Sequence, residues 1–156
     1  ERFLSHVEGE LKPSKSYKMA VLHALLDMAD EGDIEPSWDI DAIAERFLAY
    51  YRDHNERRPD WPELAKSNNP EEFAVARAKA HILKMPLHYL SNSDDKFFHL
   101  DTGGNRFALV DKIAAFWRDE RFRELVRERV EYAEAVYWFR WEKNSDTDRT
   151  ASHHPT

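Results

Sequence analysis

The sequence predicts a mainly α-helical domain with one β-hairpin, winged-helix-like in its order of elements and closed by a long C-terminal helix. Two observations support this fold class. Apolar residues recur at helical spacing in several segments before residue 84 and again after residue 120. Between them, residues 96–110 alternate apolar and polar side chains around a Gly-Gly turn, which indicates a hairpin.

Composition excludes several classes of function. The chain has 156 residues and no cysteine, so disulfides, thiolate catalysis and cysteine-bound metals are excluded. It has no apolar run long enough to span a membrane and no signal pattern, and we expect a cytoplasmic protein. We divide the chain into a lead-in or linker (1–15), the winged-helix-like domain (16–142) and a disordered tail (143–156).

The first predicted helix is Ser16–Asp30, and either Ser14 or Ser16 can cap its N-terminus. Its apolar stripe is wide, which indicates burial on more than one side. Gly32 suits the left-handed conformation that commonly ends a helix.

A short extended segment and a second helix follow. The extended segment is Ile34–Trp38, and Pro36 excludes it from the centre of a sheet. Asp39 is the predicted N-cap of the second helix, Ile40–Asp53, in which apolar residues fall at helical spacing. A loop then runs to Asn69, and Trp61 is expected to anchor this loop on the core.

The third predicted helix, Asn69–Lys84, opens with an Asn-Pro pair typical of helix starts. Its predicted apolar stripe consists of Phe73, Ala76, Ala80 and Leu83. Arg77, His81 and Lys84 fall on a neighbouring face, and in a winged-helix fold this helix would be the recognition helix. A solvated face is the alternative that the sequence leaves open.

The hairpin is predicted from two strands, Lys96–Leu100 and Arg106–Val110, joined by residues 101–105, which tolerate positive φ angles. Lys96 and Arg106 supply its positive charge. On the hairpin of a DNA-binding module such residues would contact phosphates, which positions a protein without reading base sequence.

The long C-terminal helix is predicted over Glu120–Glu142. Its expected apolar face consists of Phe122, Leu125, Val126, Val130, Ala133, Val136 and Tyr137. The end of the helix is apolar on all sides, so it must pack against this domain's core or against a neighbour. We therefore expect Tyr137, Trp138 and Trp141 to form a partner interface, because aromatic residues are frequent interface anchors.

Charge is distributed unevenly along the chain. The net charge is −7, and residues 1–56 hold six Lys and Arg against 13 Asp and Glu. Residues 77–112 reverse this balance, with six Lys and Arg against four Asp and Glu. Only this second region would attract a phosphate backbone, so any nucleic-acid binding should be weak and salt-dependent.

No catalytic motif occurs in the chain, and we expect a protein without enzymatic activity. Three histidines, His81, His88 and His99, surround the third helix and the hairpin. Their spacing does not specify a zinc site, so we expect no metal or other cofactor. They could instead make binding sensitive to pH, because histidine titrates near neutrality.

Three segments of the chain resemble a known protein family: Ser16–Asp27, Ile43–Tyr51 and Arg129–Tyr132. They resemble an accessory region near the C-terminus of bacterial DEAD/DEAH-box helicases of the restriction and phage-defence type. The similarity extends over roughly residues 11–141 and carries over no catalytic residue. It implies a helper domain that acts on foreign DNA beside a motor or nuclease supplied elsewhere.

Two functions remain open from the sequence. In the first, the domain engages or positions DNA, with Arg77, His81 and Lys84 towards the duplex and Lys96 and Arg106 on phosphates. In the second, it is a protein-interaction or scaffold domain that docks onto a helicase or nuclease partner. The acidic net charge and the aromatic end of the last helix favour the second function. The oligomeric state is left open.

Overall fold

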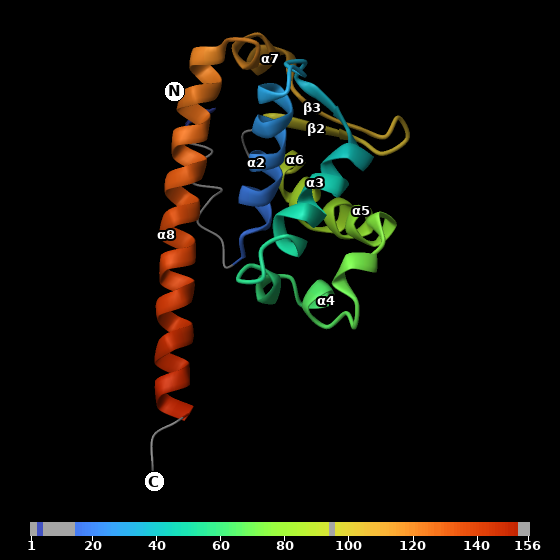
Figure 1. The fold of residues 1–156 in the computed structure, drawn as a ribbon. Coiled ribbons are helices and arrows are strands. Elements are labelled where there is room, and N and C mark those ends of the chain that lie inside the picture. The colour runs from blue at the N-terminus through green and yellow to red at the C-terminus, as the bar shows by residue number, and fades with distance from the viewer. Residues whose placement is uncertain (1–2, 5–14, 94–95, 153–156) are drawn as a thin grey trace.

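The computed structural model describes residues 3–4, 15–93 and 96–152, with side chains described up to residue 143. This part of the chain is mostly helical, with a small three-stranded antiparallel sheet and a long C-terminal helix (Figure 1). The predicted fold class is therefore confirmed at this level. The elements are α2 (Tyr17–Asp30), β1 (Ser37–Asp39), α3 (Ile40–Arg52), η1 (Arg58–Asp60), α4 (Pro62–Ala65), η2 (Pro70–Glu72), α5 (Val75–Lys84), α6 (Pro86–Ser91), β2 (Phe98–Asp101), β3 (Arg106–Leu109), α7 (Asp111–Trp117) and α8 (Glu120–Ser152).

The sheet has the strand order β1-β3-β2, so the second strand of the hairpin is central. The extended segment before α3 becomes an edge strand, with Trp38 opposite Phe107. Pro36 lies just outside it, and its carbonyl accepts the Leu109 N–H at 2.9 Å. Proline lacks a backbone donor and is tolerated at an edge, as the sequence predicted. In chain order β1 therefore lies between α2 and α3, and α6 lies between α5 and the hairpin.

Helix α2 is the centre of the hydrophobic core. Ten of its 14 residues are buried, and it lies between α8 on one side and α3 on the other (Figure 1). It ends as predicted at Gly32, whose φ is 105°. The Asp33 N–H returns to the Met28 carbonyl and the Gly32 N–H to that of Ala29, both at 3.0 Å, which is a Schellman end.

The third helix starts later than the sequence predicted. Pro70–Glu72 form a separate short 3-10 helix, Phe73 is extended, and α5 begins at Val75. The physical reason is Phe73, which is buried against Trp61 with ring centroids 5.1 Å apart and so interrupts the helical path. The predicted apolar stripe is wrong at Ala76 and Ala80, which are exposed, while Phe73 is buried and Leu83 packs against the core. The fully buried residues of α5 are Ala78 and Ile82.

Helix α8 continues beyond its predicted end and contradicts the predicted disordered tail as far as Ser152. The sequence has no proline or glycine between residues 120 and 152, so nothing in the backbone stops the helix. Its C-terminal part extends past the rest of the molecule (Figure 1). Residues 153–156 lie outside the described residues.

The predicted lead-in contributes to the core at one described position. Phe3 is buried, and its ring contacts those of Phe97, Phe98 and Phe122. It therefore does not behave as part of a solvated linker. Most of this segment, residues 1–2 and 5–14 with the possible cap Ser14, lies outside the described residues.

Candidate functional site

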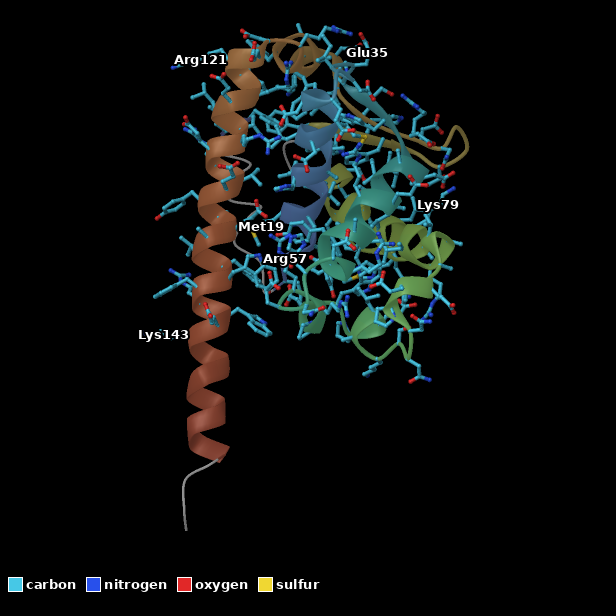
Figure 2. All side chains as sticks on the ribbon, in the orientation of Figure 1. Met19, Glu35, Arg57, Lys79, Arg121 and Lys143 are labelled. Atoms are coloured by element: carbon cyan, nitrogen blue, oxygen red, sulfur yellow. The ribbon has the colours of Figure 1, made fainter. Side chains whose placement is uncertain are left out.

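Helix α5 carries three of the five residues predicted to contact DNA, and carboxylates of the same domain neutralise part of its charge. The exposed Arg77 pairs with Glu63 at 2.9 Å. Lys79, which lies between Arg77 and His81 in the sequence, pairs with Asp41 at 2.9 Å and lies on the side of the molecule away from α8 (Figure 2). Lys84 is exposed at the end of the helix. Positively and negatively charged side chains are therefore neighbours on the surface around α5.

The prediction that His81 lies on this solvent-facing surface is wrong. Its ring packs against Tyr17, Trp61 and Phe47, with centroid separations of 4.6, 5.0 and 5.5 Å. Burial among these rings lowers the pKa of His81. Both the ring packing and the lowered pKa disfavour a positive charge at His81, and the half-buried ring instead packs against the aromatic core.

The two hairpin cations lie at opposite ends of the hairpin. Lys96 is exposed just before β2, in a left-handed conformation with φ of 50°. Arg106 starts β3 beside the turn, opposite Asp101. Its Nη2 donates to the Ser37 carbonyl at 2.8 Å and its Nε to the Ser37 hydroxyl at 3.1 Å, which ties β3 to β1. The five predicted residues consequently do not form one continuous basic surface.

The aromatic end of α8 packs onto this domain, which corrects part of the predicted partner interface. The Tyr137 hydroxyl donates to Asp60 Oδ1 at 2.8 Å, and the Trp138 indole N–H donates to the Tyr50 hydroxyl at 3.3 Å. Trp141 contacts Trp138, with ring centroids 6.1 Å apart. Tyr137 and Trp138 therefore fasten α8 to the core, which is one of the two alternatives that the sequence left open.

Asp60, which is 2% exposed, joins three separate segments of the chain. Its Oδ2 accepts the Ser16 N–H at 2.9 Å and the Ser16 hydroxyl at 2.5 Å, while Oδ1 accepts Tyr137 of α8. Its backbone carbonyl accepts the Tyr17 hydroxyl at 2.9 Å. Burial, together with the Asp60 charge, raises the pKa of Tyr17 to about 12. Ser16 thus occupies the N-cap position of α2, but its hydroxyl donates to Asp60 and makes no capping hydrogen bond with the helix.

A second buried carboxylate, Glu134, lies on the inner side of α8. It accepts the Tyr50 hydroxyl at 2.7 Å, and its Oε1 lies 3.0 Å from His23 Nδ1 on α2. The other ring nitrogen of His23 lies 3.2 Å from Asp27. Because both nitrogens face carboxylates, only the protonated imidazolium can donate to both. The hydrogen bond with Glu134 accordingly raises the pKa of His23.

No residue-type signal in the sequence identified these two carboxylates. Asp60 follows a proline in a loop, and Glu134 is one of many acidic residues on a helix rich in both signs of charge. Only the packing of α8 against α2 and η1 brings their donors together. Their role is structural, because each hydrogen bond joins two elements of this domain.

The two histidine environments predict opposite dependences of stability on pH. The pKa of His23 is raised in the folded state, so its stabilising contribution is present below about pH 6.5 and is lost as pH rises through the folded pKa. The pKa of His81 is lowered, so its effect on stability becomes unfavourable as pH falls below about 6.5. Replacing His23 by glutamine should remove only the first contribution.

As pH falls from about 8 to about 5.5, the free energy of unfolding should therefore change less favourably for His23→Gln than for the wild type, because the variant lacks the His23 contribution. Urea denaturation at a series of pH values measures this difference. His88→Gln, an exposed histidine on α6, is the matched control and should follow the wild-type curve. Identical pH profiles for His23→Gln and the wild type would contradict the assignment.

The outer side of α8 carries the most exposed large apolar side chains among the described residues. Tyr132 is 73% and Phe139 is 66% exposed. Their seven-residue spacing places them on one line along the helix, together with the half-buried Leu125. The sequence assigned Leu125 to the core-facing side, whereas the core-facing side of α8 is built on Val126 and Val130. This outer line is the apolar surface that the packing of the domain leaves uncovered on α8.

In the part of the chain that the structure describes, no helix is long and apolar enough to cross a membrane. No three His, Asp or Glu side chains there form a group that could hold a metal ion, and His81, His88 and His99 do not come together as one. Comparison with protein-family models, curated proteins and solved structures finds no match for this chain.

Proposed function

We propose that this protein is a non-catalytic interaction domain that docks onto a helical partner segment through the outer side of α8. The observation that carries the proposal is the exposure of Tyr132 and Phe139 on one line of a helix. Most large aromatic side chains of this domain are buried, including Trp38, Trp61 and Trp117. Two aromatic rings left in solvent on the same line are typical of a binding surface.

The inner side of α8 supports the same proposal. Tyr137, Trp138 and Glu134 hold the helix against the body through hydrogen bonds to Asp60, Tyr50 and His23. A helix fixed in this way presents its outer residues without further ordering, which lowers the entropic cost of binding. The resemblance of residues 11–141 to a helicase accessory region favours an assembly that contains a helicase or nuclease.

Site-specific photocrosslinking in the native cell tests this function. A photoreactive phenylalanine analogue at Tyr132 or Phe139 should form a covalent adduct with a discrete protein. The same analogue at Tyr89, a 52% exposed tyrosine on α6, is the matched control and should remain uncrosslinked. Equal crosslinking at all three positions, or none at Tyr132 and Phe139, would contradict the proposal.

Weak duplex binding is a second candidate function. It is favoured by the position of α5 directly before α6 and the hairpin, as in a recognition helix, and by the exposure of Lys84 and Lys96. The pairing of Arg77 with Glu63 reduces the positive charge available there. Binding would therefore be backbone-directed and strongly salt-dependent.

The variant Arg77→Glu/Lys84→Glu tests this second function. If α5 contacts phosphates, the variant should lose duplex binding, as measured by fluorescence anisotropy over a salt series with single- and double-stranded DNA. Arg118→Glu/Arg121→Glu makes the same charge change where α7 ends and α8 begins, and should retain binding. Unchanged binding by the α5 variant would exclude this site.

A further inference from the structure

We propose that the helical segment that docks on α8 is α8 of a second copy of this chain, and that the two helices run parallel. This inference rests on the proposed function, because it names the partner of the same surface. It is carried by a repeat in charge and size along the outer side of α8. We call this surface the outer face; its residues are Leu125, Glu128, Arg129, Tyr132, Ala135, Val136, Phe139, Glu142 and Lys143.

The outer face repeats every seven residues. A central line is formed by Leu125, Tyr132 and Phe139. Three residues after each of these comes an acidic or small residue, and four residues after each comes a basic or aliphatic one. These flanking pairs are Glu128 with Arg129, Ala135 with Val136, and Glu142 with Lys143. A seven-residue repeat keeps the same face towards a partner helix along its whole length when the two supercoil.

The flanking residues lie on opposite sides of the central line. At about 100° per residue, Glu128, Ala135 and Glu142 fall on one side, and Arg129, Val136 and Lys143 fall on the other. The outer face therefore has an acidic edge, with Ala135 between its two glutamates, and a basic edge, with Val136 between its two cations. The buried Val126 and Val130 lie on the reverse side of the helix. The basic edge is half-buried at Arg129, whose Nη1 donates to the Leu125 carbonyl at 3.4 Å, whereas Tyr132 and Phe139 on the central line are exposed.

The orientation of the pair follows from these edges. In a parallel pair related by a twofold axis along the helices, the acidic edge of each copy meets the basic edge of the other. Glu128 then lies level with Arg129 of the second copy, and Glu142 with Lys143 of the second copy. In an antiparallel pair like edges meet, so that Glu128 would face Glu142 and Arg129 would face Lys143. Like charges opposite one another disfavour that arrangement.

The size of the outer face sets the expected strength. The line from Leu125 to Phe139 is about 21 Å long at about 1.5 Å per residue. Two helices in contact over this length bury an area at the low end of specific interfaces. We therefore expect a reversible dimer in the micromolar range, in which Tyr132 and Phe139 are the anchors. The variant Tyr132→Glu/Phe139→Glu should weaken association by about 100-fold or more.

Sedimentation equilibrium of the intact chain over micromolar to millimolar concentrations measures this association. The matched control is Tyr89→Glu/Phe116→Glu, which removes two exposed aromatic residues outside α8 and should leave the dimer unchanged. Circular dichroism verifies that both variants are folded. A monomeric wild type at every concentration would overturn the inference.

Charge reversal tests the orientation. Glu128→Arg places arginine beside Arg129 of the second copy in a parallel pair and should weaken the dimer by about threefold to tenfold. Adding Arg129→Glu restores opposite charges across the pair and should recover the affinity. In an antiparallel pair, Glu128→Arg would instead face Glu142 and strengthen association. That result would overturn the parallel arrangement.

Cysteine crosslinking gives an independent readout, because the chain has no cysteine of its own. In a parallel pair only the positions of the central line meet their own counterparts, so Leu125→Cys and Phe139→Cys should both form disulfide-linked dimers. An antiparallel pair cannot satisfy both, since the two positions are about 21 Å apart along the helix. Glu71→Cys, at an exposed site on η2, is the control and should form no disulfide-linked dimer.

These experiments separate failure of this inference from failure of the proposed function. A monomeric chain that nevertheless photocrosslinks at Tyr132 to a different protein would overturn only the self-pairing. A chain that neither self-associates nor crosslinks at Tyr132 would overturn both.

Discussion

Replacing Asp60 with alanine should lower the free energy of unfolding by about 3–5 kcal/mol. The Asp60 carboxylate is 2% exposed and accepts hydrogen bonds from the Ser16 N–H, the Ser16 hydroxyl and the Tyr137 hydroxyl. Alanine removes this acceptor from the two Ser16 donors, which are fully buried, and from the hydroxyl of the half-buried Tyr137. Each buried donor without an acceptor costs about 1–3 kcal/mol. Urea denaturation at neutral pH measures the loss.

The effect of Asp60→Ala should also reach α8. The hydrogen bond from Tyr137 to Asp60 holds α8 against the rest of the domain, so hydrogen exchange in the middle of α8 should accelerate in this variant. Asp53→Ala removes an exposed carboxylate that pairs with its neighbour Arg52, and should change stability by no more than about 0.5 kcal/mol. Similar losses for the two variants would contradict the role assigned to Asp60.

Replacing Trp61 with alanine should have an effect of comparable size, about 3–5 kcal/mol. Its indole is 1% exposed and contacts the rings of Phe47, Phe73 and His81, with centroid separations of 5.1, 5.1 and 5.0 Å. Removing it opens a cavity that the surrounding rings can fill only in part. Thermal or urea denaturation measures the loss.

A second readout links Trp61→Ala to His81. The pKa of His81 is lowered by burial among aromatic rings. Water that enters beside the ring should therefore raise this pKa towards its ordinary value, which an NMR titration of the His81 ring protons follows. Trp141→Ala removes a half-exposed indole that contacts Trp138, and should cost less than about 1 kcal/mol without moving the His81 pKa. An unchanged His81 pKa in Trp61→Ala would contradict this interpretation.

Several elements were determined by local sequence. Gly32 ends α2 in a left-handed conformation because glycine has no Cβ to obstruct it. The Gly-Gly turn and its alternating flanks specify the hairpin, and Trp61 anchors the loop as the sequence predicted. These predictions succeeded because each depends on the backbone preferences or the hydrophobicity of a few neighbouring residues.

The candidate sites could be predicted less well from the sequence, because they depend on which side of a helix faces the body of the domain. On α5, the burial of Phe73 delays the start of the helix, and His81 then packs into the aromatic core while Arg77 pairs with Glu63. The spacing of basic residues along a helix is the same whether their side chains face solvent, a carboxylate or an aromatic ring. The partners that decide this come from α2, from α3 and from the segment formed by Trp61 and α4.

The same reason governs α8, the element with the greatest functional interest. Its sequence determined that it is a helix with more aromatic residues than one buried side can hold. Only the tertiary structure decided that Tyr137 and Trp138 face Asp60 and Tyr50, and that Tyr132 and Phe139 remain outside. Buried hydrogen-bond acceptors on other segments select the inner side. The apolar residues left over on the opposite side then define the surface available to a partner.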